Sequence, residues 1–323
     1  MDIPGSLPFS KAFDFASGAI GERFQNPFWK LKELFFGGRL RRAVSEVKNF
    51  GQMIVFNAVQ QRQTRTKSAE SQSTKDSDTS RHNLIDSLLD HLDDHQIVAD
   101  AAMNYLSAGR DTTAQSLTWT LYLLLRNPES VATILAELTE RFSTPTPTNA
   151  LSFSTVQPGS LPYITATFNE ALRLYPPVPV ELKECTADTT FPDGTWLPKG
   201  AVVMWVPWAM GRSRQIWGQD ADDFHPERWL GSASDQPMTK SAFEFPVFNG
   251  GPRACLGKKM AELLAVYVIS ALIREYEFEE VLDEKHGSHK MANERKSQNS
   301  LTLPMAGGLP VIVKRRQGAD CGS

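Results

Sequence analysis

The sequence predicts a mainly α-helical protein with minor β structure, and three observations point to this class. Apolar residues recur at a helical period in most segments before residue 176 and again between residues 256 and 276. Short strand-like segments separated by turn-forming Pro and Gly are concentrated between residues 178 and 206. A length of 323 residues, 41% of them hydrophobic, suffices for a large buried core. We expect one domain spanning residues 1–323, although this length would also accommodate two.

Helices are predicted to dominate the first half of the chain. The spacing of apolar residues over 24–60 predicts two amphipathic helices. The polar stretch that follows, residues 61–80, has no aromatic residue and is predicted to be a mobile loop within the domain. Four further helices are expected, and the pair Pro176 and Pro177 must end the last of them. Their predicted ranges are 83–92, 99–125, 128–142 and 163–175.

The second half is predicted to contain short strands and one long helix. The helix is expected at 256–276, after a loop-rich stretch. Residues 301–304 and 309–313 are expected to pair as a terminal hairpin, and the polar segment 286–300 is expected to be a solvated insertion. The strands of a small sheet, joined by Pro and Gly turns, are predicted at 178–185, 189–191 and 202–206.

Composition and charge exclude several classes of function. A formal net charge of -3 provides no broad basic field, so nucleic acid is not an expected partner. The N-terminal segment lacks the basic flank and the continuous apolar run of a signal peptide or membrane anchor. The three cysteines, Cys185, Cys255 and Cys321, are too few and too scattered for a disulfide framework. These features favour a reducing compartment such as the cytoplasm for this chain.

One cysteine follows a glycine-rich loop and directly precedes the long helix expected at 256–276. The loop reads Phe-Asn-Gly-Gly-Pro-Arg-Ala-Cys-Leu-Gly and places Cys255 at the N-terminus of that helix. The helix dipole and free backbone N–H groups favour the thiolate form of a cysteine in this position. A lone cysteine is more often a buried structural residue, and this alternative is weighed against the pattern as a whole.

The pattern F-x-x-G-x-R-x-C-x-G closely resembles the haem-binding loop of the cytochrome P-450 superfamily. The resemblance implies that Cys255 is the axial ligand to the iron of haem b, iron protoporphyrin IX. Phe248 would pack beside the sulfur, and Arg253 would pair with a haem propionate. Gly251 and Gly257 would allow the backbone to approach the flat macrocycle closely.

Two further motifs of this superfamily contain charged residues that are expected to meet in the fold. The helix predicted at 163–175 contains Glu170-Ala-Leu-Arg173, and a later loop contains Pro-Glu-Arg228-Trp. A Glu and Arg three residues apart share one helix face, and an exposed ion pair of this spacing is common. The resemblance implies instead that Glu170, Arg173 and Arg228 form a buried network that stabilises the haem-bearing core.

A third motif, Ala-Gly-Arg-Asp-Thr-Thr, lies in the middle of the helix predicted at 99–125. In the superfamily this motif forms an oxygen-binding groove, which implies that Ala108 and Gly109 leave space beside the haem and that Asp111 and Thr112 deliver protons. By itself the motif fits an amphipathic helix with a solvent-facing Asp equally well. Lys183 occupies the position at which relatives have a basic residue, often Arg, that meets a propionate.

The resemblance implies a haem-thiolate monooxygenase that uses O2 and receives electrons from NADPH through a flavoprotein reductase. Several segments are similar to the fatty-acid and alkane ω-hydroxylase branch, which implies a small hydrophobic substrate. The chain is expected to have the cytochrome P-450 fold truncated at its N-terminus, because the first third of the family fold is not recognisable. A full-length relative would reside in the endoplasmic reticulum membrane. The alternative is an inactive or non-catalytic haem-binding remnant of such an enzyme.

Overall fold

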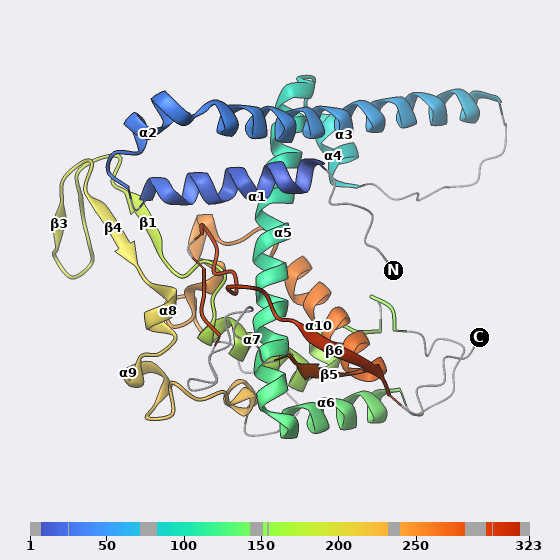
Figure 1. Cartoon of the computed structure of the whole chain (residues 1–323), viewed down its shortest axis with the longest axis vertical. Coiled ribbons are helices and arrows are strands. Elements are labelled where there is room, and N and C mark those ends of the chain that lie inside the picture. The colour runs from blue at the N-terminus through green and yellow to red at the C-terminus, as the bar shows by residue number, and fades with distance from the viewer. Residues whose placement is uncertain are drawn as a thin grey trace. The chain divides into compact units, whose positions relative to one another are not determined.

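The computed structural model describes residues 8–24, 26–71, 83–142, 151–153, 155–231, 240–281, 295–298 and 300–316. These residues form two compact units, and the long helix α5 (His95–Arg126) contributes to both, with the division after Arg110 (Figure 1). Most of the described residues are helical and the strands are short, so the predicted class, mainly α with minor β, is confirmed. Within this part of the chain, no helix combines the length and apolar character needed to cross a lipid bilayer.

The first unit is built from helices alone. Helices α1 and α3 pack through small residues, with Ala12 and Ala16 against Leu40 and Ala43. Farther along α3, Val55 contacts the start of α5 at Val98 and Ala99, and apolar residues of α4 cover this cluster. The side chain of Asn83 caps α4 by accepting a hydrogen bond from the Asp86 N–H at 2.9 Å. The helices are α1 (Pro8–Gly21), α2 (Trp29–Phe36), α3 (Gly38–Ser71), α4 (Leu84–His91) and the first part of α5.

Helix α3 continues farther than the sequence predicts. The two helices expected over 24–60 correspond to α2 and α3, but α3 extends to Ser71, so a loop is wrong for residues 61–71. The reason is that Gln, Arg, Lys, Ala and Glu, which are common in this stretch, all favour helix. Because nucleation is the costly step, extending an existing helix through polar residues requires little burial. Residues 72–80 lie outside the described residues.

The core of the second unit lies where α6, α7 and α10 pack together with the end of α5 (Figure 1). Helices α6 and α7 begin with Pro128 and Pro162, a position at which the missing N–H of proline costs nothing. The carboxylate of Glu137 on α6 caps α7 by accepting hydrogen bonds from the N–H groups of Tyr163 (2.7 Å) and Ile164 (3.1 Å). The three helices are α6 (Pro128–Arg141), α7 (Pro162–Leu174) and α10 (Lys258–Glu275), and their core side chains include Ile134, Leu138, Ile164, Phe168, Leu172, Val266, Ile269 and Ile273.

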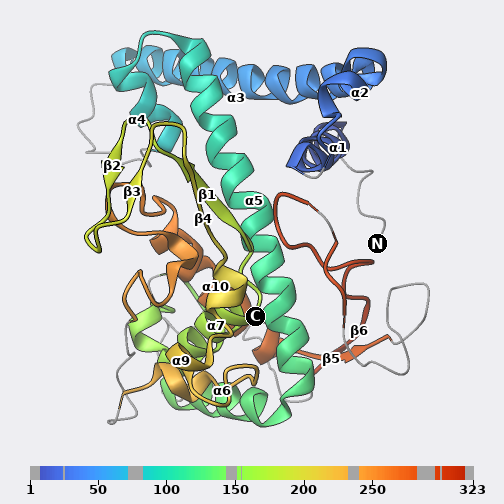
Figure 2. The ribbon, with the colours of Figure 1, turned by 90° about the vertical axis from the view of Figure 1, so that its left-hand side faces the viewer.

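Short antiparallel ribbons complete the second unit, and Figure 2 shows β1 and β4 side by side. In this pair Glu181 lies opposite Trp205, and Lys183 lies opposite Val203. The predicted strands at 178–185, 189–191 and 202–206 are therefore confirmed, with a further strand, β3, opposite β2. The ribbons are β1 (Glu181–Glu184) with β4 (Val202–Trp205), β2 (Thr189–Thr190) with β3 (Trp196–Leu197), and β5 (Tyr276–Glu280) with β6 (Val311–Arg315); the short helices α8 (Pro207–Met210) and α9 (Arg214–Trp217) follow β4.

Two predictions for the C-terminal part need correction. The expected hairpin between 301–304 and 309–313 is wrong, because β6 pairs with β5 immediately after α10. Aromatic residues alternate with Glu at the start of β5, and an alternation with a period of two residues is typical of a strand. Within the segment 286–300, Arg295 is 5% exposed and its Nε donates to Glu280 at 2.7 Å, so this residue is not solvated. Residues 286–294 and 299 of that segment lie outside the described residues.

Candidate functional site

The cysteine loop connects the 3-10 turn Pro246–Phe248 to the start of α10. The Cys255 N–H donates to the Phe248 carbonyl at 2.7 Å, which closes the loop into a ring. The Cys255 side chain is exposed, and among the described residues no side chain caps the N-terminus of α10. The exposed sulfur at the start of this 18-residue helix is accessible to a bound group.

The backbone of this loop has an unusual conformation at two residues. Asn249 and Gly251 have φ values of 58° and 61°, which lie in a region that residues with a Cβ atom rarely adopt. Gly250 is required sterically, because an added Cβ would lie 2.8 Å from the Cβ of Ala242. At Gly257 an added Cβ would lie 3.9 Å from the Cys255 Sγ, an ordinary contact distance. Space beside Gly251 is open, which leaves the loop accessible to a flat ligand.

The other predicted haem-contacting residues of the second unit lie on this loop and on β1. Phe248 is partly buried against the α6, α7 and α10 core, which fixes the residue that precedes the loop. Arg253 is exposed, so its guanidinium is accessible to a propionate. Lys183 projects from β1 with its Nζ 5.4 Å from the Trp205 ring centroid.

Glu170 and Arg173 on α7 form a fully buried ion pair, with both residues 0% exposed. The Arg173 Nε and Nη2 each donate to the Glu170 carboxylate at 2.7 Å. The remaining N–H groups of Arg173 donate to the backbone carbonyls of Gly211, Ala221 and Asp223. Five donors and five acceptors are thereby matched, which a buried guanidinium requires.

Arg228 joins the same network from the 3-10 turn Pro226–Trp229. Its Nε donates to Glu170 Oε1 at 2.9 Å, and the Trp229 Nε1 donates to Glu170 Oε2 at 2.8 Å. Arg228 also pairs with Asp220 at 3.0 Å, nearer the surface. The structure thus brings Glu170, Arg173 and Arg228 together, as the resemblance implies, and adds Trp229 and Asp220, which sequence reasoning missed.

A tyrosine gives the same turn a second attachment to α7. The Tyr163 hydroxyl donates to Glu227 Oε1 at 2.8 Å, and burial of this hydroxyl raises the pKa of Tyr163 to about 12. Tyr163 therefore remains a neutral donor throughout the physiological pH range. The turn 226–229 is held at both ends of α7, by Tyr163 and by Glu170.

The residues Ala108, Gly109, Asp111 and Thr112 all lie within the continuous helix α5. The division between the two units follows Arg110, so Asp111 and Thr112 belong to the same unit as Cys255. One turn farther along, the buried Ser116 donates its hydroxyl to the Thr112 carbonyl at 2.7 Å. A hydroxyl bonded to the preceding turn competes with the helical ladder and is typical of a bent or weakened helix segment.

The comparison with known protein families identifies the family of the chain. A family model described as cytochrome P450 matches residues 10–303. The chain belongs to the cytochrome P450 family. The match covers both compact units and includes the cysteine loop, the α7 ion pair and the α5 motif, which confirms the resemblance of the sequence to this superfamily.

Individual cytochrome P450 relatives agree with this assignment. The chain is 34% identical to cytochrome P450 CYP94D108 of Paris polyphylla, 32% identical to cytochrome P450 94A1 of Vicia sativa, and 35% identical to cytochrome P450 86B1 of Arabidopsis thaliana. The alignments cover 96%, 95% and 97% of this chain but 59%, 57% and 56% of those relatives. The chain therefore spans less than two thirds of the length of these P450 proteins.

The residues of the cysteine loop fit a haem group. The family requires a thiolate that can reach the iron, and the Cys255 sulfur is exposed at a helix N-terminus with the backbone of Gly251 open beside it. Arg253 and Lys183 are cations that could pair with haem propionates, Lys183 through a single-point contact where a guanidinium would offer two. The sequence did not indicate that Glu181 contacts the cysteine loop, where its Oε2 accepts a hydrogen bond from Asn249 Nδ2 at 2.6 Å.

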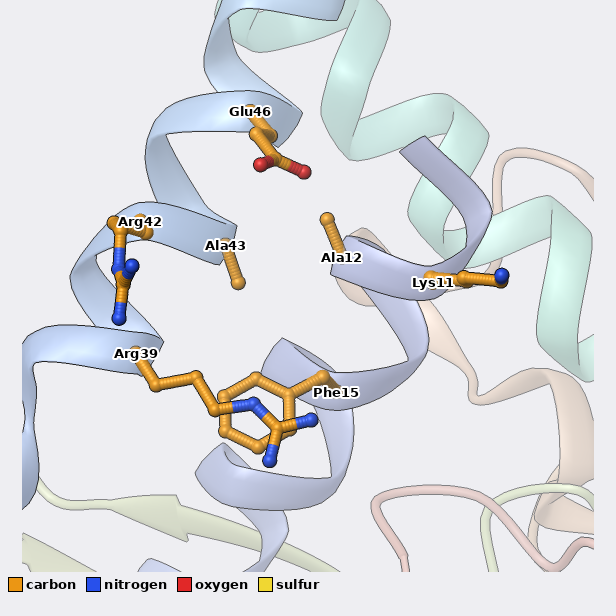
Figure 3. Close-up of a pocket in the computed structure, with 7 residues that line it drawn as sticks. All are labelled: Lys11, Ala12, Phe15, Arg39, Arg42, Ala43 and Glu46. Atoms are coloured by element: carbon orange, nitrogen blue, oxygen red, sulfur yellow. The ribbon is translucent and has the colours of Figure 1, made fainter. Parts of the chain in front are cut away.

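A groove of about 540 Å³ lies elsewhere, between α1 and α3 of the first unit (Figure 3). The Arg39 guanidinium lies 4.1 Å from the Phe15 ring centroid, and the charged side chains of the groove are exposed. No thiol or imidazole is present among the residues that line it, which are Lys11, Ala12, Phe15, Arg39, Arg42, Ala43 and Glu46. It has the character of a solvated face of two packed helices, so we assign the chemistry to the cysteine loop.

Proposed function

We propose that this chain provides the catalytic part of a haem-thiolate monooxygenase that hydroxylates a small hydrophobic substrate. The observation that carries the proposal is the exposed Cys255 sulfur, presented by a closed loop at the N-terminus of α10 in a chain of the P450 family. Cys255 would hold the iron of haem b as its axial ligand. When bound, the haem supplies reductive activation of O2, with the thiolate donating electron density to favour O–O cleavage.

The surrounding residues would hold and orient the cofactor. Phe248 would pack beside the sulfur, while Gly251 and Gly257 would leave the backbone free to approach the macrocycle. Arg253 and Lys183 would neutralise the propionates, Arg253 through a fork of two N–H groups and Lys183 as a point charge. The buried ion network around Glu170 would keep the core beneath this loop rigid, because displacing it leaves an unpaired internal charge.

Asp111 and Thr112 on α5 are the proposed proton-handling residues. A carboxylate can take up a proton from solvent at its Oδ atoms, and the adjacent Thr112 Oγ1 can accept it and pass it on. Ala108 and Gly109 would leave the space that O2 and water need next to these groups, since neither has a bulky side chain. Electrons would come from NADPH through a flavoprotein reductase.

Fatty acids and alkanes are the proposed substrate class. This step rests on the similarity of residues 179–200, 209–230 and 248–262 to the fatty-acid and alkane ω-hydroxylase branch. The test is to supply the chain with the reductase, NADPH and either dodecanoic acid or dodecane, and to locate any added hydroxyl by mass spectrometry. Hydroxylation of neither compound, under conditions in which the haem is reduced, would exclude this class.

The thiolate ligand is tested by one optical spectrum. The 323-residue chain is produced with haem, reduced and exposed to carbon monoxide, and a red-shifted Soret band is expected. Cys255→Ala should abolish that band, whereas Cys185→Ala, a matched variant beyond the end of β1, should retain it. Haem bound by Cys255→Ala with an unchanged spectrum refutes the assignment. Failure of the unaltered chain to take up haem favours the alternative, an inactive remnant of a P450 enzyme.

A further inference from the structure

The cysteine loop is attached to strand β1 by one side-chain hydrogen bond. Asn249 Nδ2 donates to Glu181 Oε2 at 2.6 Å, and both residues are partly buried. The two residues are 68 positions apart in the sequence, so the contact exists only in the folded chain. Glu181 is itself held in place by the β1–β4 pairing, in which it lies opposite Trp205. A carboxylate acceptor on a fixed strand is a strong anchor for an amide donor.

The backbone at Asn249 shows that this attachment carries a cost. Among the described residues, Asn249 is the only residue other than glycine with a positive φ, and its φ and ψ values of 58° and -179° lie close to a region used almost only by glycine. A glycine at this position would relieve the strain. Strained conformations persist where the surroundings over-determine them, and they gather at functional sites. The side-chain amide that reaches Glu181 is the feature that glycine would lack.

The residue next to Asn249 in the chain is hydrogen-bonded to the cysteine. Asn249 follows Phe248, whose carbonyl accepts the Cys255 N–H at 2.7 Å. Fixing Asn249 therefore fixes the acceptor that closes the loop behind the sulfur. Side chains alternate along a strand, so Glu181 and Lys183 share one face of β1. The same contact therefore turns the Lys183 face of the strand toward the cysteine loop.

We propose that Glu181 is a positioning residue for the thiolate ligand, acting through Asn249 to set the place and direction of the Cys255 sulfur. The proposal rests on the proposed function, because a haem ligand is what the loop would present. Loss of the contact frees the loop to relax at Asn249, the Phe248 carbonyl moves, and the hydrogen bond to Cys255 opens more often. The ligand is then offered to the iron in a range of orientations instead of one.

Hydrogen exchange of the full chain without added haem tests the attachment by itself. Glu181→Ala and Asn249→Ala should each accelerate exchange of the Cys255 amide by about tenfold or more, the factor expected when a hydrogen bond to a charged group is lost. Glu184→Ala is the matched control, since Glu184 is an exposed glutamate on the opposite face of the same strand. Equal exchange of residues 248–257 in the Glu181 and Glu184 variants overturns the proposal.

A second measurement separates positioning from simple structural support. With haem and carbon monoxide, Glu181→Ala and Asn249→Ala should reduce the fraction of the red-shifted band, and Glu181→Gln, which keeps an acceptor oxygen, should restore most of it. Asn249→Gly should also reduce this fraction while leaving the thermal midpoint unchanged or higher, because it removes the backbone strain. An intact band in Asn249→Gly and Glu181→Ala refutes positioning. If the unaltered chain binds no haem, the proposed function fails, and the exchange data still decide whether the attachment exists.

Discussion

Replacing Glu170 by Gln tests whether the buried network holds the second unit together. The Glu170 carboxylate accepts five hydrogen bonds, from Arg173 (two, each 2.7 Å), Trp229 (2.8 Å), Arg228 (2.9 Å) and the His225 N–H (2.9 Å). Glutamine has the same shape but carries no charge, and one of its terminal atoms is a donor. Whichever atom becomes the NH2 group will face at least two donors and lose their hydrogen bonds.

The magnitude follows from burial. Arg173 is 0% exposed, so removing its counter-charge leaves a cation inside the core, which costs about 3 to 5 kcal/mol. Losing two hydrogen bonds to a charged group, at roughly 1.5 kcal/mol each, gives about 3 kcal/mol by a separate route. Domains of ordinary stability unfold at a cost of about 5 to 15 kcal/mol, so this one substitution should remove a large share of the total.

Urea unfolding followed by tryptophan fluorescence measures this loss. Trp229 donates to Glu170, and the Trp217 ring centroid lies 5.2 Å from the Arg173 guanidinium carbon, so both indoles report on the network. We expect the midpoint to fall by roughly 1 M or more. Asp220→Asn is the matched control, because it makes the same chemical change on the exposed partner of Arg228 and should shift the midpoint far less. Equal shifts for the two variants would show that burial of Glu170 does not govern the energy.

Three further predictions concern the second unit. Thr167→Val should stabilise the chain by about 1 kcal/mol in thermal unfolding, because the buried Thr167 hydroxyl has no hydrogen-bond partner among the described residues. Gly211→Ala should cost about 1 to 3 kcal/mol or more in urea unfolding, since its Cβ would lie 2.1 Å from the Arg173 carbonyl oxygen, whereas Gly159→Ala, with open space, should be tolerated. Burial acts to raise the pKa of Glu280, but hydrogen bonds from two arginines outweigh it and hold that pKa below the ordinary 4.5. Ionised Glu280 therefore stabilises the fold above pH 4.5, and this stability is lost as the pH falls through the lowered pKa. When the unfolding midpoint is measured as a function of pH, Glu280→Gln should show a smaller decrease at acidic pH than the unaltered chain.

Local sequence patterns predicted the long helices of the second unit but not the long-range pairing of strands. The predicted helix at 128–142 and α6 (Pro128–Arg141) agree almost to the residue, because Pro128 marks the start and the apolar period marks the buried face. The pairing of β5 with β6 was missed, because the paired residues are 31 to 39 positions apart and no local sequence signal records the pairing. Similarly, composition identified residues 61–71 as polar but did not reveal that α3 was already nucleated upstream.

In the candidate site too, residues of local motifs were predicted, whereas residues that matter through long-range contacts were not. The spacing around Cys255 predicts a haem ligand at this position, and Glu170 with Arg173 were predicted to pair from a motif of four residues. Asn249 and Glu181 were not singled out, because their significance depends on a contact across 68 residues. A sequence signal existed at Asn249, where a residue that tolerates positive φ stands directly before two glycines. The partner Glu181 had no such signal.

A short segment joins α7 to β1, and a carboxylate lies on the element at each of its ends. Glu170 anchors the end of α7, and Glu181 begins β1 only eleven positions later. Between them the backbone is also tied, because the Pro177 carbonyl accepts the Leu303 N–H at 2.9 Å and the Pro179 carbonyl accepts the Trp208 N–H at 3.3 Å. Because both ends and the middle of this segment are hydrogen-bonded, we expect a movement of α7 to move β1 as well. We therefore expect the buried network to restrict where β1 starts and β1 to restrict the loop that carries the Cys255 sulfur. The rigidity of the core would then reach the proposed ligand through this segment and the hydrogen bond between Glu181 and Asn249.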